Sequence, residues 1–240
     1  MSAAKDSEVR AGQPAAAQPV LSEFLLRLCH DLRSPLRAIR AHTELLVKDW
    51  PAPRDATLEE RLRFITSGAD TIELLLSGLA SYSLALGIDQ GSFQQAQMEV
   101  LLRLVVAKLR KELREAEAEV TYDTLPRVTG NPDRLSQLLE ILLLNGVRHR
   151  GKEPPRIHVS AERQGADWVF AVRDNGPGIE SAYLERVFKP FERLRGKELP
   201  GPGLGLAIAR LIAERHGGKM WAESRPGSGA TFLFTLPAGE

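Results

Sequence analysis

Two neighbouring side chains near the N-terminus, His30 and Asp31, form a pair that can carry out nucleophilic chemistry. A histidine ring attacks through a nitrogen that holds a free lone pair, and a nearby carboxylate can accept a hydrogen bond from the ring or help to remove its proton. His30 follows Leu28 by two residues, which is about 200° of helical rotation and turns the ring away from the apolar side of a helix. On its own such a pair is more often a solvated polar pair than a reactive one.

A second candidate group lies in the last third of the chain, where Asp174 precedes two glycines, Gly176 and Gly178. The residues before Asp174 are rich in Val and Phe and predict a strand. Its carboxylate is therefore expected at a strand end, beside backbone that carries no side chains. A hydrogen-bond acceptor in such a place suits the edge of a flat base, although Asp-Asn-Gly is also common in ordinary turns.

A third group consists of the alternating glycines Gly201, Gly203 and Gly205, which come just before a segment of helical spacing. The first amides of a helix point away from its N-terminus, and together with the helix dipole they can hold a phosphate. A glycine triplet is weak evidence by itself. This group is therefore a candidate phosphate site that needs support from the rest of the sequence.

The composition excludes several classes of protein. The chain has 240 residues, 43% of them apolar, and 32 basic side chains balance 31 acidic ones. Binding to nucleic acid usually requires a basic footprint, which this chain lacks. Cys29 is the single cysteine, so an intramolecular disulfide and a cysteine-based zinc site are excluded. Apolar runs are too short for a membrane span and the N-terminus lacks the pattern of a signal peptide, so we expect a cytoplasmic location.

Apolar residues recur every three or four positions over residues 21–88 and predict two long helices. Trp-Pro-Ala-Pro at 50–53 separates them, and the second begins after Asp55 or Thr57. Pro35 cannot donate a backbone hydrogen bond and is expected to bend or loosen the first helix. The predicted seam comprises Leu21, Leu25, Leu28, Leu32, Pro35, Ile39 and Leu46 on the first helix and Leu58, Leu62, Ile65, Ala69, Ile72, Leu76, Leu79, Ser83 and Leu86 on the second.

Two helices joined by a short turn form an antiparallel hairpin, but this apolar stripe is too extensive for one partner helix to cover. We therefore predict a homodimer in which residues 21–88 of two chains form a four-helix bundle. Residues 1–20, rich in Ala, Gln, Pro and charge, are interpreted as a disordered leader, and residues 87–91 as a linker.

The pattern over residues 92–240 is mixed and predicts a second domain. Helices are expected at 100–113, from Asn131 onward and at 204–215, with short strands at 119–122 and 127–129. Two hairpins are predicted, one from strands at 156–161 and 168–172, and one over 219–236 turned at 225–229. Strands in pairs with helices grouped between them suggest an α/β sandwich with its helices on one face of a mixed sheet.

These stretches, in this order, resemble the boxes of sensor histidine kinases, and the resemblance covers roughly residues 21–236. It implies an α+β fold, with a dimerisation and histidine-phosphotransfer hairpin followed by a catalytic ATP-binding domain of the type shared with gyrase and chaperone ATPases. In that family His30 would be phosphorylated from ATP, and Asp31 would assist it. Ser34, one turn on, stands where relatives with phosphatase activity carry Thr or Asn to orient a water.

The resemblance also assigns the nucleotide site. Asp174 would accept a hydrogen bond from the adenine amino group, and Asn145 would bind Mg²⁺ through its side-chain oxygen. Arg148 takes the place of a lysine near the phosphates. Residues 193–202 would form a lid that follows the Phe188–Phe191 box, with Arg195 and Lys197 as phosphate contacts. The sequence departs from the family at Ile141, where a polar residue such as Asn is frequent.

The family's phosphoryl group passes to an aspartate on a receiver domain of a response regulator, so such a protein is the expected partner, together with an unidentified sensor domain or sensor protein. A degenerate module that binds nucleotide without catalysis is the main alternative, and Ile141 is the reason to consider it. An ATPase or a serine kinase of the same superfamily is disfavoured, because neither requires a His-Asp pair on a dimerising helix. The remaining histidines, His42, His149, His158 and His216, are interpreted as surface or packing residues.

Overall fold

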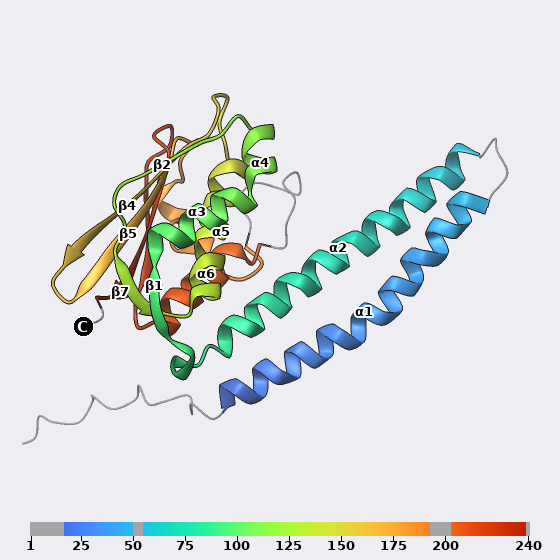
Figure 1. Ribbon diagram of the computed structural model, residues 1–240. Helices are drawn as coiled ribbons and strands as arrows, with labels where there is room; N and C mark the ends of the chain where they lie inside the picture. The colour runs from blue at the N-terminus through green and yellow to red at the C-terminus, as the bar shows by residue number, and fades with distance from the viewer. Residues whose placement is uncertain (1–16, 50–54, 193–202, 239–240) are drawn as a thin grey trace, which may run out of the picture.

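The computed structural model describes residues 17–49, 55–192 and 203–238, with side chains from Leu21 onward. It opens with an antiparallel hairpin of two long helices, α1 (Ala17–Asp49) and α2 (Ala56–Leu86), as the sequence predicts (Figure 1). The Asp55 carboxylate caps α2 by accepting the Thr57 N–H at 3.0 Å. α1 is helical on both sides of Pro35, so this proline is accommodated inside the helix and does not end it. No helix within these ranges is long and apolar enough to cross a bilayer.

The two helices pack through side chains that recur every seven residues. At the open end of the hairpin, the Ser22 hydroxyl donates to the Ser83 carbonyl at 2.8 Å, and the Ser83 hydroxyl donates to the Ser22 carbonyl at 2.6 Å. These small side chains let the backbones approach closely and leave no buried hydroxyl unpaired. The buried positions of the contact are Ser22, Cys29, Leu36 and Thr43 on α1 and Leu62, Ala69, Leu76 and Ser83 on α2.

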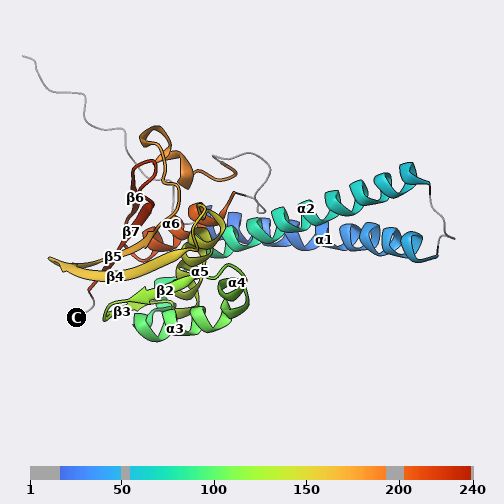
Figure 2. The same ribbon diagram turned by 90° about the horizontal axis from the view of Figure 1, so that it is seen from above.

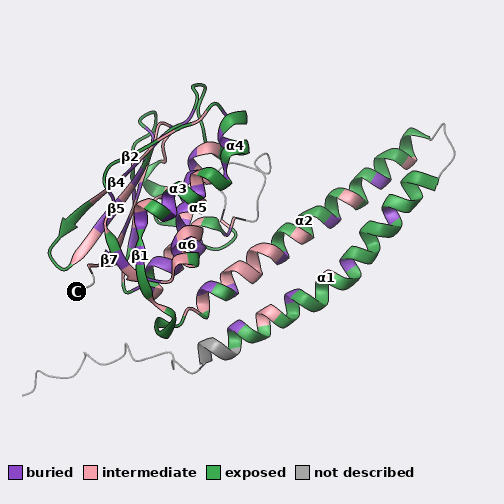
Figure 3. Cartoon of the chain, in the orientation of Figure 1, coloured by how far each residue is buried: buried purple, intermediate pink, exposed green. Residues whose placement is uncertain are grey.

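The contact on α1 is displaced by one residue from the predicted seam. Most of the seam on α1 is left in solvent, and the surface of α1 is exposed over most of its length (Figure 3). Ile39 and Leu46, for example, are 52% and 50% exposed. We call these side chains the exposed stripe, which consists of Leu21, Leu28, Leu32, Ile39 and Leu46 on α1 and Ile65 and Ile72 on α2. One partner helix therefore covers only part of the apolar surface, as the sequence predicts.

The second domain is built on a five-stranded sheet in the order β2-β4-β5-β7-β6. β2 and β4 are parallel and the other neighbours are antiparallel. A separate two-stranded sheet joins β1 (Gln94–Gln97) to β3 (Arg127–Gly130). The strands of the main sheet are β2 (Glu119–Tyr122), β4 (Arg156–Gln164), β5 (Asp167–Asp174), β6 (Met220–Ser224) and β7 (Ala230–Pro237).

Helices cover one face of this sheet, and the long hairpin extends away from the domain (Figures 1 and 2). The strand side chains that face the helices form the core, where the rings of Phe170 and Phe234 stack at 4.8 Å. The helices are α3 (Met98–Lys108), α4 (Arg110–Glu115), α5 (Pro132–Arg148) and α6 (Gly205–Arg215). The predicted helix at 100–113 is thus two helices, because the chain turns at Leu109, which lets both Leu109 and Leu113 enter the core.

The end of α2 packs against α6, and Ala85 is buried in the core of the second domain. The connection that follows α2, residues 87–93, is held in place by His216, a buried residue just after α6. Its ring stacks on Phe93 with centroids 4.6 Å apart. Its Nδ1 donates to the Ile212 carbonyl at 2.7 Å and its Nε2 accepts the Asn131 N–H at 3.0 Å. A neutral imidazole therefore joins the connection, the start of α5 and the end of α6.

Burial lowers the pKa of His216, with its hydrogen bond to the Ile212 carbonyl opposing this effect. The folded protein therefore binds no proton here at a pH where the unfolded chain begins to do so. As pH falls below about 6.5, the ordinary histidine pKa, the free energy of unfolding should decrease. We expect urea unfolding to show that the free energy of unfolding decreases from pH 7.5 to pH 5.5. This decrease should be larger in the unmodified chain than in His216→Gln, by up to about 1.3 kcal/mol. Equal decreases in the two proteins would contradict this expectation.

Candidate nucleotide site and phosphorylation site

His30 and Asp31 lie on α1 with their side chains 83% and 78% exposed. The His30 Nδ1 is 3.2 Å from the Asp31 Oδ1. A carboxylate only accepts hydrogen bonds, so this contact favours the tautomer that carries its proton on Nδ1 and leaves a lone pair on Nε2. Ser34 is exposed one turn further along. The structure thus presents an accessible imidazole nitrogen with a hydroxyl on the same side of the helix.

Arg33 is a residue near this site that the sequence interpretation missed. Its Nε donates to the Glu73 carboxylate at 3.2 Å, and another nitrogen of its guanidinium donates to the Ser77 hydroxyl at 3.1 Å. Both partners lie on α2, so these bonds link the two helices beside the turn that carries His30. An arginine facing an acid on the opposite helix could be recognised in advance only if the register of the hairpin were known.

Asp174 ends β5 with a half-buried carboxylate whose Oδ1 accepts two backbone hydrogen bonds. The Gly176 N–H donates at 2.8 Å and the Ala230 N–H at 3.1 Å. Burial raises the pKa of Asp174, and these two hydrogen bonds oppose the rise. Within the described residues no hydrogen bond engages Oδ2. Asp174 thus combines a fixed orientation with one unused acceptor atom.

The two glycines after Asp174 are required by close packing. A side chain on Gly178, where φ is +74°, would collide with the Arg225 carbonyl. A Cβ on Gly176 would lie 2.8 Å from both the Asp174 Oδ1 and the His149 carbonyl oxygen. The segment is therefore clamped between the end of α5 and the turn that joins β6 to β7. This position supports the interpretation of Asp174 as part of a site and argues against an ordinary surface turn.

Asn145 is half-buried in the last turn of α5, next to the strand that carries Asp174. The neighbouring Gly146 faces the sheet, and a Cβ built on it would lie 3.6 Å from the Asp174 Cβ. The adjacent helix turn and strand end bring Asn145 and Asp174 into one region. Arg148 follows in the same turn and is exposed.

The first turn of α6 lies against the same helix. A Cβ on Gly205 would be 3.4 Å from the Ile141 side chain, and Ile141 packs against the hydrophobic core. Ile141 is one turn before Asn145, so the two share a face of α5, and this face meets the start of α6. Gly203, with φ +71°, leads into α6, while Gly201, Arg195 and Lys197 lie outside the described residues.

The Phe188–Phe191 box comes just before the segment 193–202 in the sequence. Phe188 is buried against Phe232 in an edge-to-face contact with centroids 6.3 Å apart, and the Arg210 guanidinium lies 5.3 Å from its ring centre. The Phe191 N–H donates to the Gly203 carbonyl at 2.9 Å. This bond holds Phe191 next to Gly203 at the start of α6.

These elements form a site that fits a nucleotide. Asp174 offers a desolvated acceptor for a base, and the first amides of α6 offer donors for phosphates. Asn145, on the helix between them, supplies a neutral oxygen of the kind that Mg²⁺ accepts when phosphates and water provide its other ligands. The described residues contain no cluster of three or more His, Cys, Asp or Glu side chains that could hold a metal ion.

Two families match consecutive parts of the chain. Residues 20–84 match the His Kinase A (phospho-acceptor) domain, and residues 130–240 match the Histidine kinase-, DNA gyrase B-, and HSP90-like ATPase family. Cyanobacterial phytochrome A from Nostoc sp. is 36% identical over 220 residues, which are 91% of this chain and 29% of that protein. The chain therefore spans less than a third of the length of this relative.

Solved structures share the same arrangement. Full-length ShkA in complex with AMPPNP superposes with a TM-score of 0.69 at 25% identity, over 90% of this chain and 46% of that one. ThkA in complex with the response regulator protein TrrA gives a TM-score of 0.62 at 23% identity, over 96% of this chain and 68% of that one, which shows the shared fold. With both family domains in this order, the chain contains the two-domain core of the sensor histidine kinases.

Proposed function

We propose that this chain phosphorylates His30 from Mg²⁺-ATP and passes the phosphoryl group to an aspartate of a response regulator. One observation supports the proposal: a single chain contains both reacting parts. His30 is exposed with its Nδ1 next to the Asp31 carboxylate, and the acceptor of the candidate nucleotide site, Asp174, is oriented by two backbone amides. Because the substrate is ATP, a cytoplasmic location is part of this proposal.

In the proposed reaction, the His30 Nε2 forms a bond to the γ-phosphorus while the bond from that phosphorus to the β,γ-bridging oxygen breaks, and ADP leaves with the bonding electrons. The Nδ1 proton stays in its hydrogen bond to Asp31, which stabilises the positive charge that develops on the ring. The Asn145 oxygen would hold the magnesium ion, and Arg148 would contribute a permanent positive charge near the phosphates. Mg²⁺ would neutralise charge on the phosphate oxygens.

Within the described residues, no hydrogen bond, ion pair or ring contact joins His30 to the nucleotide domain. The domain instead packs on α2 through α6. The reaction therefore requires either a movement of the nucleotide domain about the connection at residues 87–93, or a second chain that brings its own nucleotide domain to His30.

The partners in this proposal are a second copy of the chain and a receiver domain. The exposed stripe supports the first, because seven large apolar side chains along one hairpin are more than a monomer usually leaves in water. ThkA, which shares the fold, was solved with the response regulator TrrA, and this supports the second. A sensor domain or sensor protein would complete the pathway. Ser34 is proposed to orient water for dephosphorylation of the receiver.

The dimer can be tested on the exposed stripe. We expect the unmodified chain to sediment as a dimer, and Ile39→Asp with Leu46→Asp to raise the dissociation constant at least roughly tenfold, because each change buries a charge in an apolar contact. Analytical ultracentrifugation measures this directly. Arg37→Asp serves as the control, because Arg37 lies on α1 about 200° of rotation from Ile39. A monomeric unmodified chain, or equal dissociation in the control, would refute the proposed interface.

The kinase activity is tested by incubating the whole chain with γ-labelled ATP and Mg²⁺. We expect label on the protein that is lost in acid and retained in alkali, as is typical of a phosphorus-nitrogen bond, and no label when magnesium is chelated. Asn145→Ala should reduce the labelling rate more than it reduces binding of the base. A chain that binds ATP but takes up no label would instead be a nucleotide-dependent binding module.

A further inference from the structure

The outer edge of β2 is a second surface of the nucleotide domain to which the proposed reaction gives no role. The Glu119 N–H donates to the Pro155 carbonyl at 2.8 Å, and the Asp123 N–H donates to the Val159 carbonyl at 3.0 Å. In a parallel pair alternate residues bond to the neighbouring strand, so Val120 and Tyr122 direct their N–H and C=O groups away from β4. Among the described strands none pairs with this edge. β2 thus presents a free row of backbone donors and acceptors.

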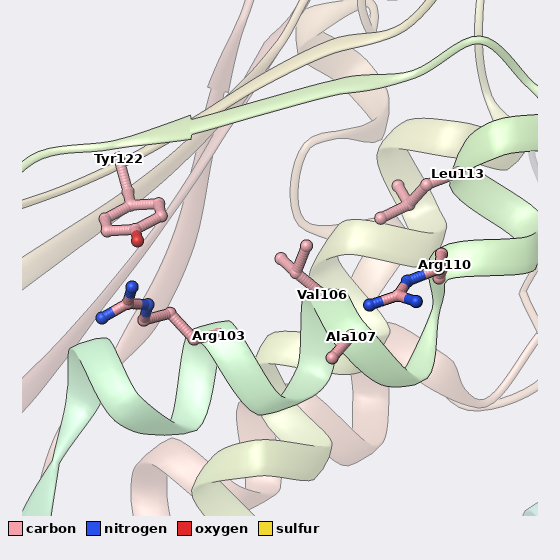
Figure 4. A pocket seen from close by; sticks show the side chains of 6 residues that line it. All are labelled: Arg103, Val106, Ala107, Arg110, Leu113 and Tyr122. Carbon is pink, nitrogen blue, oxygen red and sulfur yellow. The ribbon is translucent and has the colours of Figure 1, made fainter.

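A groove of about 350 Å³ runs between this strand and the helices α3 and α4. Figure 4 shows Tyr122 reaching from β2 toward α3, Arg103 rising beneath its ring, and Arg110 facing the same space from the start of α4. The remaining lining residues, Val106, Ala107 and Leu113, are apolar. The groove therefore has an apolar middle and a guanidinium group near each end.

These two guanidinium groups are poorly compensated. The Arg103 side chain is 67% exposed, and its closest ion-pair partner, Glu99, is 3.9 Å away, beyond hydrogen-bond distance. Arg110 is exposed and forms no ion pair with the described part of the chain. Arginine binds carboxylates through paired hydrogen bonds, so both groups suit an acidic ligand.

We propose that β2 and this groove bind an extended acidic peptide segment of a partner protein, which adds as a strand to the free edge. Its backbone would bond to the outward N–H and C=O groups of Val120 and Tyr122. Alternate side chains of a strand face the same side about 6.8 Å apart, so acid, apolar and acid residues at positions i, i+2 and i+4 span roughly 14 Å. Arg103 on α3 and Arg110 at the start of α4 lie on either side of the apolar middle of the groove, so their long side chains can reach the two acidic residues.

The free backbone edge, the apolar groove and the flanking charges favour a peptide over a compact small molecule, because only an extended chain uses all three at once. None of the lining residues belongs to the nucleotide site or to the His30 site. Binding here would bring a partner to the catalytic domain without blocking either site.

The test uses the whole chain and a synthetic probe, the blocked peptide Thr-Glu-Thr-Val-Thr-Glu-Thr. We expect saturable shifts of the Val120 and Tyr122 amide resonances in heteronuclear correlation spectra, with a dissociation constant of about 1 mM or lower. Arg103→Glu with Arg110→Glu should weaken this binding at least roughly tenfold. The same variant should bind the probe with lysine in place of glutamate, which the unmodified chain should not bind.

The matched control is Lys111→Glu with Arg114→Glu, which reverses two charges on α4 outside the groove. Binding should persist in this control. The proposal is overturned if the probe causes no saturable shift at Val120 and Tyr122, if it shifts other regions only, or if the control weakens binding as much as the groove variant does. Correlation spectra of each variant also report whether the domain is folded, so loss of structure is separated from loss of binding.

Discussion

The His30→Gln variant is expected to lose acid-labile labelling by at least about 1,000-fold, because it removes the only atom proposed to form the bond to phosphorus. Glutamine has a similar reach, but its amide nitrogen has no lone pair available for attack. Binding of ATP should be unchanged, since His30 lies on α1 and contacts none of the described residues of the nucleotide site. The measurement is the rate of label incorporation from γ-labelled ATP, together with the ATP dissociation constant.

His42→Gln is the matched control, because His42 is also exposed on α1 and has no acidic neighbour in the chain. This control should label at the unmodified rate. Retained labelling in His30→Gln would assign the phosphoryl group to another residue. Asp31→Asn should give an intermediate rate, because the amide oxygen can still accept the Nδ1 hydrogen bond but no longer offers a charge to stabilise the ring.

Most of the fold could be predicted from periodicity, and the exceptions have physical reasons. The predicted seam marks the apolar surface of α1 but does not show which part faces α2 of the same chain. The observed contact includes Ser22 and Thr43, two buried polar residues that hydropathy does not mark. β1 was missed because Gln-Gln-Ala-Gln has only Ala96 as a buried residue, and its pairing with β3 is made by backbone. The turn at Leu109 carries no Gly or Pro that would announce it.

The site could be predicted where a motif fixes local backbone, as at Asp174 and its glycines. It could not be predicted where the role depends on elements distant in sequence. Ile141 stands where the family often has a polar residue, and the sequence does not reveal that its side chain packs beneath Gly205 at the start of α6. His216 was interpreted as a surface or packing residue, and it is a packing residue, but the sequence does not reveal that its ring accepts the N–H of Asn131, 85 residues away. Such pairings appear only after the chain has folded.

Asp174→Asn is expected to weaken ATP binding by roughly 30- to 150-fold, equivalent to about 2 to 3 kcal/mol, while leaving the fold intact. Because Oδ1 accepts the Gly176 and Ala230 amides, asparagine should keep its oxygen there and place its NH₂ group where Oδ2 was. A donor would then face the adenine amino group, which is also a donor. Isothermal titration with ATP measures the loss, and Asp167→Asn at the other end of β5 is the control.

The raised pKa of Asp174 determines what this variant should do to stability. A carboxyl whose pKa rises on folding binds protons more tightly in the folded state. Its contribution to the free energy of unfolding therefore falls as pH rises from about 3.8, the ordinary pKa, through the raised pKa of the folded state, and remains lower at pH 7. Asparagine does not ionise, so it avoids the cost of burying a charged carboxylate. Urea unfolding at pH 7 should therefore show that Asp174→Asn is at least as stable as the unmodified chain. A marked loss of stability would mean that the ionised carboxylate itself is needed for folding.

Inosine triphosphate separates recognition of the base from general damage to the site. Its six-membered ring carries a carbonyl where adenine carries an amino group. The NH₂ group that Asp174→Asn introduces would face another donor in ATP, but it should donate a hydrogen bond to the carbonyl of inosine triphosphate. The ratio of ATP to inosine triphosphate affinity should therefore fall in Asp174→Asn and stay unchanged in Asp167→Asn. If both nucleotides were weakened equally, the Asp174 carboxylate would be supporting the site without reading the base, because only a direct hydrogen bond distinguishes an amino group from a carbonyl at that position.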